Sequence, residues 1–485
     1  MLQADYKFDF IQISIMKIEQ IYTECLAQGA YYIESNGEAA VIDPLREVKP
    51  YLNRVALDNA KIKYIFETHF HADFVSGHVT LAKVTGADII YGPNAKTSFN
   101  AIIAEDNQVF KVGNITITVL HTPGHTMESS VYLLKDEDGK DHAIFSGDTL
   151  FLGDVGRPDL AQKTGNLTEE DLAGFLYNSL RTKVMPLADD VIVYPAHGAG
   201  SSCGKSLSKE TVDTLGNQKA TNYALRADMT KEEFVKEVTD GLLPPPSYFP
   251  FNVQMNKEGY DDFQDVLARS AKALSPDAFE AAANETEAIV LDVRHQNEFA
   301  KGHIPRSIFI GLDGSFAPWV GALIADVKQS ILLVTPIGLE EETITRLSRV
   351  GFDKTMGYLK GGFLTWKKAS KEYDTVTSII ADTLKGVKEE EEDVLVFDVR
   401  KEGEFLSEHV LDAKHTPLNY LNNHLTTFPS KKSFYLYCAG GYRSMIAASI
   451  LKSRGIHNFI DIAGGFEAIK KTEVQVSNYV CPSTL

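Results

Sequence analysis

The sequence is poor in cysteine, in excess positive charge and in long apolar runs. Its four cysteines in 485 residues are too few and too scattered for a disulfide framework, and their scarcity favours a reducing cytoplasm. Lys and Arg number 48 against 66 Asp and Glu, so the net charge of −18 excludes a basic nucleic-acid footprint and disfavours acidic membranes. No apolar stretch approaches the roughly 20 residues that span a bilayer. We therefore expect small molecules or proteins as partners, with no nucleic acid and no membrane.

The residues before Met16 do not read as a signal peptide, because Lys7 and Asp9 interrupt their apolar positions. Their alternating pattern could form an extra edge strand, or they could come from an over-extended start codon. We expect a protein that is not exported.

The overall composition, 44% apolar and 24% charged, excludes a disordered, collagenous or disulfide-scaffold chain and is typical of a globular protein. At about 150 residues per domain, the length predicts about three domains. A helix is predicted over Thr230–Leu243, and Gly241 with the prolines at 244–246 ends it. A first domain boundary is therefore expected between this point and Ser275.

Four short apolar runs in the first 250 residues are each followed closely by His or Asp. This alternation predicts buried strands that deliver polar side chains to one edge of a sheet. The runs cover residues 62–66, 115–120, 143–145 and 191–194.

The remainder of the chain is an internal repeat. Segment 291–310 reappears as 397–416, and segment 332–366 reappears as 435–469. This spacing predicts two successive α/β units of about 100 residues. The acidic run at 389–393 is expected to be a solvated loop in the second unit.

Six potential metal ligands follow the four predicted strands. Imidazole and carboxylate ligands suit zinc, iron or manganese, and six of them at strand ends predict a metal site. They are His69, His71, Asp73, His125, Asp148 and His197.

The segments THFHAD, HTPGHT, GDTLF and PAHG resemble the metallo-β-lactamase superfamily over the N-terminal half of the chain. The resemblance implies an αββα sandwich with the metal site at one edge of two sheets. Hydrolases of that family, such as glyoxalase II, bind a second zinc partly through a His directly after the Asp of the motif. Phe74 stands there in this chain, which favours a single metal ion.

The segments HTPGHTMES (121–129) and GDVGRPDL (153–160) are more similar to the persulfide dioxygenase branch. That resemblance implies one Fe(II) per chain, bound by His69, His125 and Asp148. A metal ion bound by two His and one carboxylate keeps open coordination positions, which also suits non-heme iron oxygenases on chemical grounds.

Five further residues are expected to act around this iron. His71, Asp73 and His197 would orient ligands or water. By resemblance, Arg157 would hold the carboxylate of a thiol substrate, which a guanidinium can bind with two hydrogen bonds. Cys203 could accept sulfur near the iron or be a small buried residue.

A second constellation begins at Cys438, between an apolar strand and a predicted helix. The loop Cys438-Ala-Gly-Gly-Tyr-Arg443-Ser444 would surround a thiolate with N–H groups at a helix N-terminus, next to an arginine. With FDVRKEGEF and AGGFEAI around it, the loop resembles the rhodanese family. This implies a sulfur-carrying Cys438, a catalytic Arg443, and Gly440, Gly441 and Ser444 as substrate-binding residues.

In the first repeat, Thr335 occupies the position of Cys438 and Glu340 that of Arg443. Threonine cannot carry a persulfide, and a carboxylate repels an anionic substrate. The predicted architecture is an αββα metallo-β-lactamase sandwich followed by two α/β rhodanese domains. Its boundaries are 1–262 for the dioxygenase domain, 270–374 for a rhodanese domain without the catalytic cysteine, which would be a spacer or docking platform, and 375–485 for an active rhodanese domain.

The combined resemblance implies an iron-dependent persulfide dioxygenase coupled to a sulfurtransferase. Its partners would be O₂, sulfite or thiosulfate, and the persulfide of glutathione, coenzyme A or bacillithiol, among which the sequence does not select; the chain could also form a homo-oligomer. One alternative is a zinc-dependent thioester hydrolase of the glyoxalase II type with an accessory sulfurtransferase domain. Another is a sulfur sensor or carrier scaffold, which the intact His69, His125, Asp148 and Cys438 disfavour.

Overall fold

The computed structural model describes residues 16–160, 167–205, 207–242, 244–391 and 393–481. The edge strand considered for the residues before Met16 lies outside these ranges. The chain divides into two compact units, Met1–Asp261 (unit 1) and Asp262–Leu485 (unit 2). None of the helices among the described residues has the length and apolar character needed to cross a bilayer.

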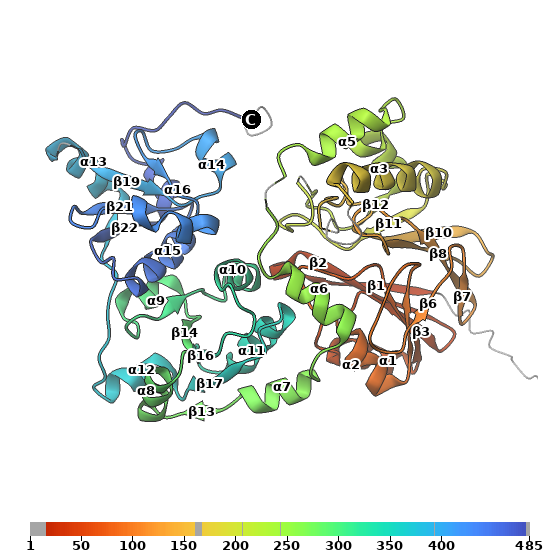
Figure 1. Ribbon diagram of the computed structural model, residues 1–485, viewed down its shortest axis with the longest axis horizontal. Coiled ribbons are helices and arrows are strands. Elements are labelled where there is room, and N and C mark those ends of the chain that lie inside the picture. Colours follow the sequence, from red (N-terminus) through yellow and green to blue (C-terminus); the bar gives the residue numbers. More distant parts are fainter. Residues whose placement is uncertain (1–15, 161–166, 206, 243, 392, 482–485) are drawn as a thin grey trace, which may run out of the picture. The chain divides into compact units, whose positions relative to one another are not determined.

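Unit 1 contains two six-stranded sheets (Figure 1). The first has the order β1 (Lys17–Thr23), β2 (Gln28–Ser35), β3 (Glu38–Ile42), β4 (Lys61–Glu67), β5 (Asp88–Tyr91) and β6 (Ile102–Ile103). The second has the order β12 (Asp213–Thr214), β11 (Ile192–Pro195), β10 (Asp141–Gly147), β9 (Ser130–Lys135), β8 (Ile115–His121) and β7 (Val109–Val112).

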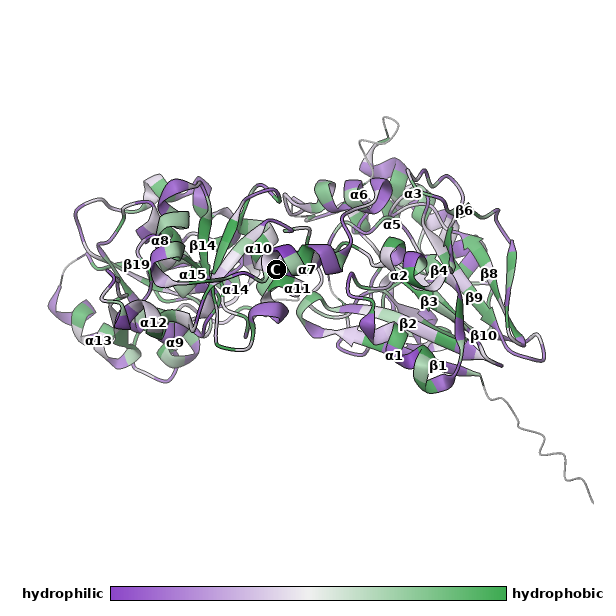
Figure 2. Ribbon diagram, turned by 90° about the horizontal axis from the view of Figure 1, so that it is seen from below, coloured by the Kyte–Doolittle hydropathy of each residue, from purple (hydrophilic) through white to green (hydrophobic). Residues whose placement is uncertain are grey.

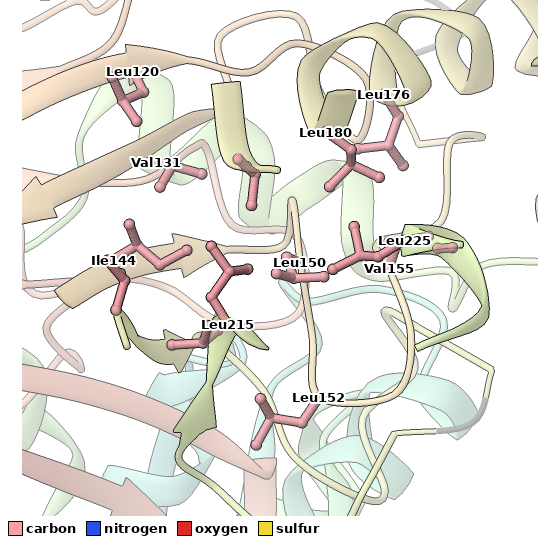
Figure 3. Close-up of a cluster of buried hydrophobic side chains, with 14 of the residues drawn as sticks. Leu120, Val131, Ile144, Leu150, Leu152, Val155, Leu176, Leu180, Leu215 and Leu225 are labelled. Carbon is pink, nitrogen blue, oxygen red and sulfur yellow. The ribbon is translucent and has the colours of Figure 1, made fainter. Parts of the chain in front are cut away.

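Helices cover the outer faces of both sheets, so unit 1 is the expected αββα sandwich. The helices are α1 (Lys49–Asp58), α2 (His78–Thr85), α3 (Glu169–Ser179), α4 (Leu215–Thr221), α5 (Lys231–Thr239) and α6 (Phe249–Glu258). Side chains of both sheets, such as Phe66 and Tyr132, form the central core. Tyr51 and Leu81 of α1 and α2 belong to an outer core against the first sheet. Leu176, Leu180 and Leu215 belong to another against the second sheet (Figure 3).

The helix expected over Thr230–Leu243 is present as α5, but it ends at Thr239, earlier than predicted. Thr230 caps it by accepting the amide hydrogen of Glu233, whose carboxylate accepts from the Thr230 amide in return. The chain becomes extended at Asp240, directly before Gly241.

Unit 2 contains two five-stranded parallel sheets with the same topology, which confirms the internal repeat. The first has the order β13 (Ala273–Leu274), β17 (Thr355–Leu359), β16 (Ile331–Val334), β14 (Ile289–Asp292) and β15 (Ile308–Phe309). The second has the order β18 (Ser378–Ile380), β22 (Phe459–Ala463), β21 (Phe434–Tyr437), β19 (Leu395–Asp398) and β20 (Lys414–His415).

Ten helices among the described residues surround these two sheets. They are α7 (Phe263–Ser270), α8 (Pro276–Glu285), α9 (Gln296–Lys301), α10 (Phe316–Leu323), α11 (Glu340–Arg349), α12 (Gly362–Lys368), α13 (Ala381–Glu390), α14 (Glu402–Ser407), α15 (Tyr442–Ser453) and α16 (Gly465–Ile469). Strands such as β14, which helices cover, are strongly hydrophobic (Figure 2).

One expectation about unit 2 needs correction. The acidic run is exposed where it is described, but its first two residues, Glu389 and Glu390, form the end of α13 and not a loop. The favourable i to i+4 spacing of Lys385 and Glu389, with 3.7 Å between their charged atoms, helps the helix extend into the run.

Candidate metal centre and cysteine loop

The candidate metal ligands of unit 1 lie just beyond the carboxyl ends of four strands. His69 follows β4, His125 follows β8, Asp148 follows β10, and His197 follows β11. All four predicted strands are present, but they belong to two sheets and not to one. The site therefore lies where the edges of the two sheets meet.

His69, His125 and Asp148 form a buried three-residue cluster. Asp148 Oδ2 lies 3.4 Å from Nε2 of His125 and 3.9 Å from Nε2 of His69. The three side chains can place one ligand atom each within 4.8 Å of one another. The structure thus brings together the three residues expected to bind the metal.

Hydrogen bonds orient both imidazoles toward this cluster. Nδ1 of His125 lies 2.8 Å from the main-chain oxygen of Arg157, which can only accept, so Nδ1 carries the proton. Nδ1 of His69 lies 3.0 Å from Thr68 Oγ1, whose own hydrogen is donated to Asp43. Each ring therefore presents the lone pair of Nε2 to the cluster, as a metal ligand requires.

The buried polar atoms of the site fit a bound cation. Neither carboxylate oxygen of Asp148 accepts a hydrogen bond from an N–H or O–H group of the described residues, and Nε2 of His197 also has no such partner. An unpaired buried carboxylate is strongly destabilised, and a divalent metal ion would compensate its charge. Burial, together with the neighbouring imidazoles, also lowers the pKa of His69, which keeps it in the neutral form that binds metals.

Nε2 of His71 lies beside two buried carboxylates. This nitrogen lies 3.1 Å from Asp43 Oδ1 and 3.4 Å from Glu67 Oε2. Burial acts to lower the pKa of His71, but Asp43 and Glu67 outweigh it and raise that pKa well above the ordinary value. Phe74 lies beside the ring with 4.3 Å between centroids. Nε2 of His71 is thus engaged by carboxylates, and His71 is not part of the cluster that His69, His125 and Asp148 form.

Asp73, His197 and Cys203 form an adjacent buried group. Nε2 of His197 lies 3.3 Å from Asp73 Oδ2 and 3.6 Å from Asp148 Oδ1, and Cys203 completes a set of ligand atoms within 4.8 Å. Burial and the nearby Asp73 and Asp148 raise the pKa of Cys203 well above its usual value. The thiol is therefore close to the metal ligands but protonated at neutral pH.

Arg157 is almost completely buried and is engaged by Asp159. Its Nε and Nη2 donate to the two oxygens of that carboxylate at 2.6 and 2.7 Å. The preceding Gly156 packs tightly against the ligands, because a Cβ there would lie 2.0 Å from the main-chain oxygen of Asp148. The structure thus gives this segment a positioning role toward His125. Binding of a substrate carboxylate by Arg157 stays a prediction.

The second constellation lies in unit 2, between β21 and α15. The amide of Gly441 donates to Sγ of Cys438 at 3.1 Å, and Gly441 adopts a positive φ of 98° that favours glycine. Arg443 donates two hydrogen bonds, of 2.6 and 2.8 Å, to the carboxylate of Glu404. The expected arginine is therefore near the loop, with its guanidinium already paired.

Ser444 is fully buried beneath this loop. Its hydroxyl lies 2.7 Å from Asp461 Oδ1 and donates to it. Burial raises the pKa of Asp461 to about 6. This arrangement gives Ser444 a role in holding the loop to β22. Substrate binding by its hydroxyl stays a prediction.

In the corresponding loop of the first repeat, a carboxylate of the chain itself accepts an amide hydrogen. The amide of Gly338, which matches Gly441 in the repeat, donates to Glu340 Oε2 at 2.9 Å. Thr335 is buried at the position of Cys438. The loop thus lacks the thiol. The carboxylate of Glu340 also accepts an amide hydrogen that would otherwise be available to an anionic substrate.

Three of these functional residues were absent from the sequence-based predictions. Glu67 directly precedes the THFHAD motif, and a carboxylate at the end of an apolar strand is an unusual feature that could have indicated it. Asp43 also ends an apolar strand, β3. Glu404 lies in the repeated FDVR segment, but nothing local indicates that its partner is Arg443.

Comparison with known proteins gives two family matches. The Metallo-beta-lactamase superfamily profile matches residues 24–197, and the Rhodanese-like domain profile matches residues 275–369 and 381–472. Among solved structures, a metallo-beta-lactamase from Staphylococcus aureus is 30% identical with a TM-score of 0.63. That similarity covers 72% of this chain and 99% of the other.

Two curated relatives resemble unit 1. A probable hydroxyacylglutathione hydrolase of Schizosaccharomyces pombe is 31% identical over 180 residues, which are 36% of this chain and 65% of the relative. The human mitochondrial persulfide dioxygenase ETHE1 is 28% identical over 221 residues, which are 45% of this chain and 78% of the relative. The chain thus spans slightly less than two thirds of the first relative, and the two names describe different reactions.

Proposed function

The chain belongs to the Metallo-beta-lactamase superfamily and carries two rhodanese-like domains, and from this membership we propose that it is an iron-dependent persulfide dioxygenase with a sulfurtransferase domain. The observation that carries the proposal is the position of His71. Asp43 and Glu67 engage Nε2 of this residue, which groups with them and not with His69, His125 and Asp148. A set of two imidazoles and one carboxylate leaves coordination positions open, as non-heme iron oxygenases require.

His69, His125 and Asp148 would hold Fe(II), whose chemistry is to activate O₂ for oxidation of the persulfide sulfur, and that sulfur supplies the electrons that O₂ accepts. The net reaction is R-S-SH + O₂ + H₂O → R-SH + H₂SO₃. The chain's own contribution is to hold Nε2 of His69 and His125 in place and to bury the site. The thiol could be glutathione, coenzyme A or bacillithiol, and we place the reaction in the cytoplasm.

Zinc-dependent thioester hydrolysis is the second candidate. It is supported by the hydroxyacylglutathione hydrolase relative and by the adjacent group of Asp73, His197 and Cys203, which could hold another ion. Phe74 disfavours it because it replaces the imidazole that dinuclear hydrolases of this superfamily use.

In unit 2, Cys438 would carry a sulfane sulfur as Cys438-S-S⁻. Sulfite would attack the outer sulfur, the S–S bond would break, and its electron pair would return to Sγ as thiosulfate leaves. The amide of Gly441, which already donates to Sγ, would stabilise the thiolate that is released. Because both sites belong to one chain, sulfite made in unit 1 would meet Cys438 at a raised effective concentration.

Oxygen uptake by Fe(II)-loaded protein with glutathione persulfide and coenzyme A persulfide tests the dioxygenase. We expect about one iron per chain, and we expect Asp148→Asn to lose iron and oxygen uptake together. Asp138→Asn, in an exposed turn, is the matched control. Two zinc ions per chain with thioesterase turnover and no oxygen uptake would establish the hydrolase instead.

A further inference from the structure

The catalytic loop of the second rhodanese domain is anchored on the domain that lacks the cysteine. Tyr442, four residues after Cys438, donates its hydroxyl hydrogen to the main-chain oxygen of Gly311 at 2.7 Å. Gly314 makes room for the ring, since a Cβ there would lie 2.4 Å from it. Ser449 of α15 accepts the amide hydrogen of Phe309 at 2.9 Å. The Cys-less domain is therefore part of the surroundings of Cys438.

A cavity of about 430 Å³ lies between the same two domains. Gln296, Asn297 and Lys301 of α9 line it from the Cys-less domain, and Gly440, Gly441 and Gly464 line it from the cysteine-containing domain. Its volume falls in the range of sites for organic ligands, roughly 300–1,000 Å³, and exceeds what a sulfur oxyanion needs.

The cavity reaches the immediate neighbourhood of the sulfur. Gly441, which lines it, donates its amide hydrogen to Sγ of Cys438. A Cβ added at Gly440 would have no heavy atom within 4 Å, so the loop borders open space at this residue. A ligand in the cavity would therefore lie against the loop that carries the cysteine.

The charges around the cavity favour a ligand with a carboxylate. Among its described lining residues, Lys301 is the only cation and Asp461 the only acid, and Asp461 is buried against Ser444. The other nearby cations are already engaged: Arg443 pairs with Glu404, and Arg400 pairs with Asp398 at 2.6 Å. Lys301 is exposed, and its ammonium can reach a ligand in the cavity.

We propose that this cavity binds the organic part of a low-molecular-weight thiol that bears a carboxylate, with Lys301 of the Cys-less domain pairing with that carboxylate. The proposal rests on the proposed sulfurtransferase function of Cys438. The thiolate R-S⁻ attacks the outer sulfur of Cys438-S-SH, the S–S bond breaks, its electron pair returns to Sγ, and R-S-SH leaves. The Cys-less domain thus contributes substrate specificity to the active one.

The test uses the full chain, with thiosulfate as sulfur donor and either glutathione or mercaptoethanol as acceptor. Glutathione carries carboxylates and mercaptoethanol does not. We expect Lys301→Gln to raise the ratio of the glutathione KM to the mercaptoethanol KM at least five-fold, with a smaller change in kcat. Lys360→Gln, an exposed lysine of the Cys-less domain outside the cavity, is the matched control and should leave the ratio unchanged.

A second variant examines the volume of the cavity. Gly440→Leu places a side chain in open space, so it should fold and should raise the KM of glutathione more than that of mercaptoethanol. An unchanged KM ratio in both variants, or equal increases for both acceptors, would overturn the proposal while leaving sulfurtransfer by Cys438 intact. Complete absence of sulfurtransfer in the wild-type chain would instead refute the proposed function, and this proposal with it.

Discussion

The imidazole of His71 faces the carboxylate of Glu67, with 3.4 Å between Nε2 and Oε2 inside the core of unit 1. Oδ1 of Asp43 lies 3.1 Å from the same nitrogen. Burial raises the pKa of Glu67 to about 7, and the charge of His71 opposes that rise. The sequence-based predictions include His71 but neither Asp43 nor Glu67, and these two carboxylates engage one nitrogen of a potential fourth ligand.

Glu67→Gln removes one of the two carboxyl groups that face Nε2 of His71. We expect the freed imidazole to turn to the metal, which should favour zinc over iron by about ten-fold or more, the scale on which residues behind metal ligands act. Metal content after anaerobic equilibration with equal concentrations of Fe(II) and Zn(II) measures this change. Glu105→Gln, at an exposed loop, serves as control. An unaltered iron-to-zinc ratio would show that Glu67 does not decide the ligand set.

Cys438→Ser should lower thiosulfate:cyanide sulfurtransfer at least about a hundred-fold and leave oxygen uptake largely intact. A thiolate is the competent sulfur acceptor at neutral pH, and an alcohol is not. Both rates can be measured on one preparation, with the exposed Cys481→Ser as control. If transfer persisted at the wild-type rate, Cys25, Cys203 or Cys481 would be the carrier.

Thr335→Cys, made in the Cys438→Ser background, should not restore sulfurtransfer. The carboxylate of Glu340 would still accept the amide hydrogen of Gly338 and repel an anionic donor. Adding Glu340→Arg should raise the rate above that of the single substitution. Cyanide-dependent thiocyanate formation measures all these rates. Full activity of Thr335→Cys alone would mean that Glu340 does not block the loop.

Asp461 should make unit 2 less stable above pH 6. Burial raises its pKa from 3.8 to about 6, so the charged form is disfavoured in the folded state. The destabilisation is absent below pH 3.8, grows between pH 3.8 and 6, and is complete above pH 6, where it amounts to about 3 kcal/mol. Asp461→Asn should therefore raise the free energy of unfolding at pH 8 by up to this amount and have little effect at pH 4.

Tryptophan fluorescence during guanidinium unfolding can measure this difference, because both tryptophans of the chain, Trp319 and Trp366, lie in unit 2. Glu390→Gln, an exposed carboxylate of the same unit, should change the stability by well under about 1 kcal/mol at either pH. An Asp461→Asn effect that is equal at pH 4 and pH 8 would contradict the assigned titration.

The sequence by itself determined the elements that depend on local pattern. Apolar runs before His69, His125, Asp148 and His197 became β4, β8, β10 and β11, because a strand's period and its turn residues are encoded in a few consecutive positions. The repeat also followed from the sequence, since two units with matching patterns adopt the same strand order. The identities of Thr335 and Cys438 then distinguished the two loops.

Only the tertiary structure decided which side chains face one another. Asp43 and Glu67 meet His71, Glu404 meets Arg443, and Tyr442 reaches Gly311 across 131 residues of sequence. Such pairs arise from strand order and from the direction of each side chain after folding, which no local period specifies. A buried charge also has no fixed partner until the surrounding elements exclude water, because it is their packing that makes an unpaired charge unfavourable. For this reason the ligands could be predicted from their motif, whereas the carboxylates that engage His71 could not.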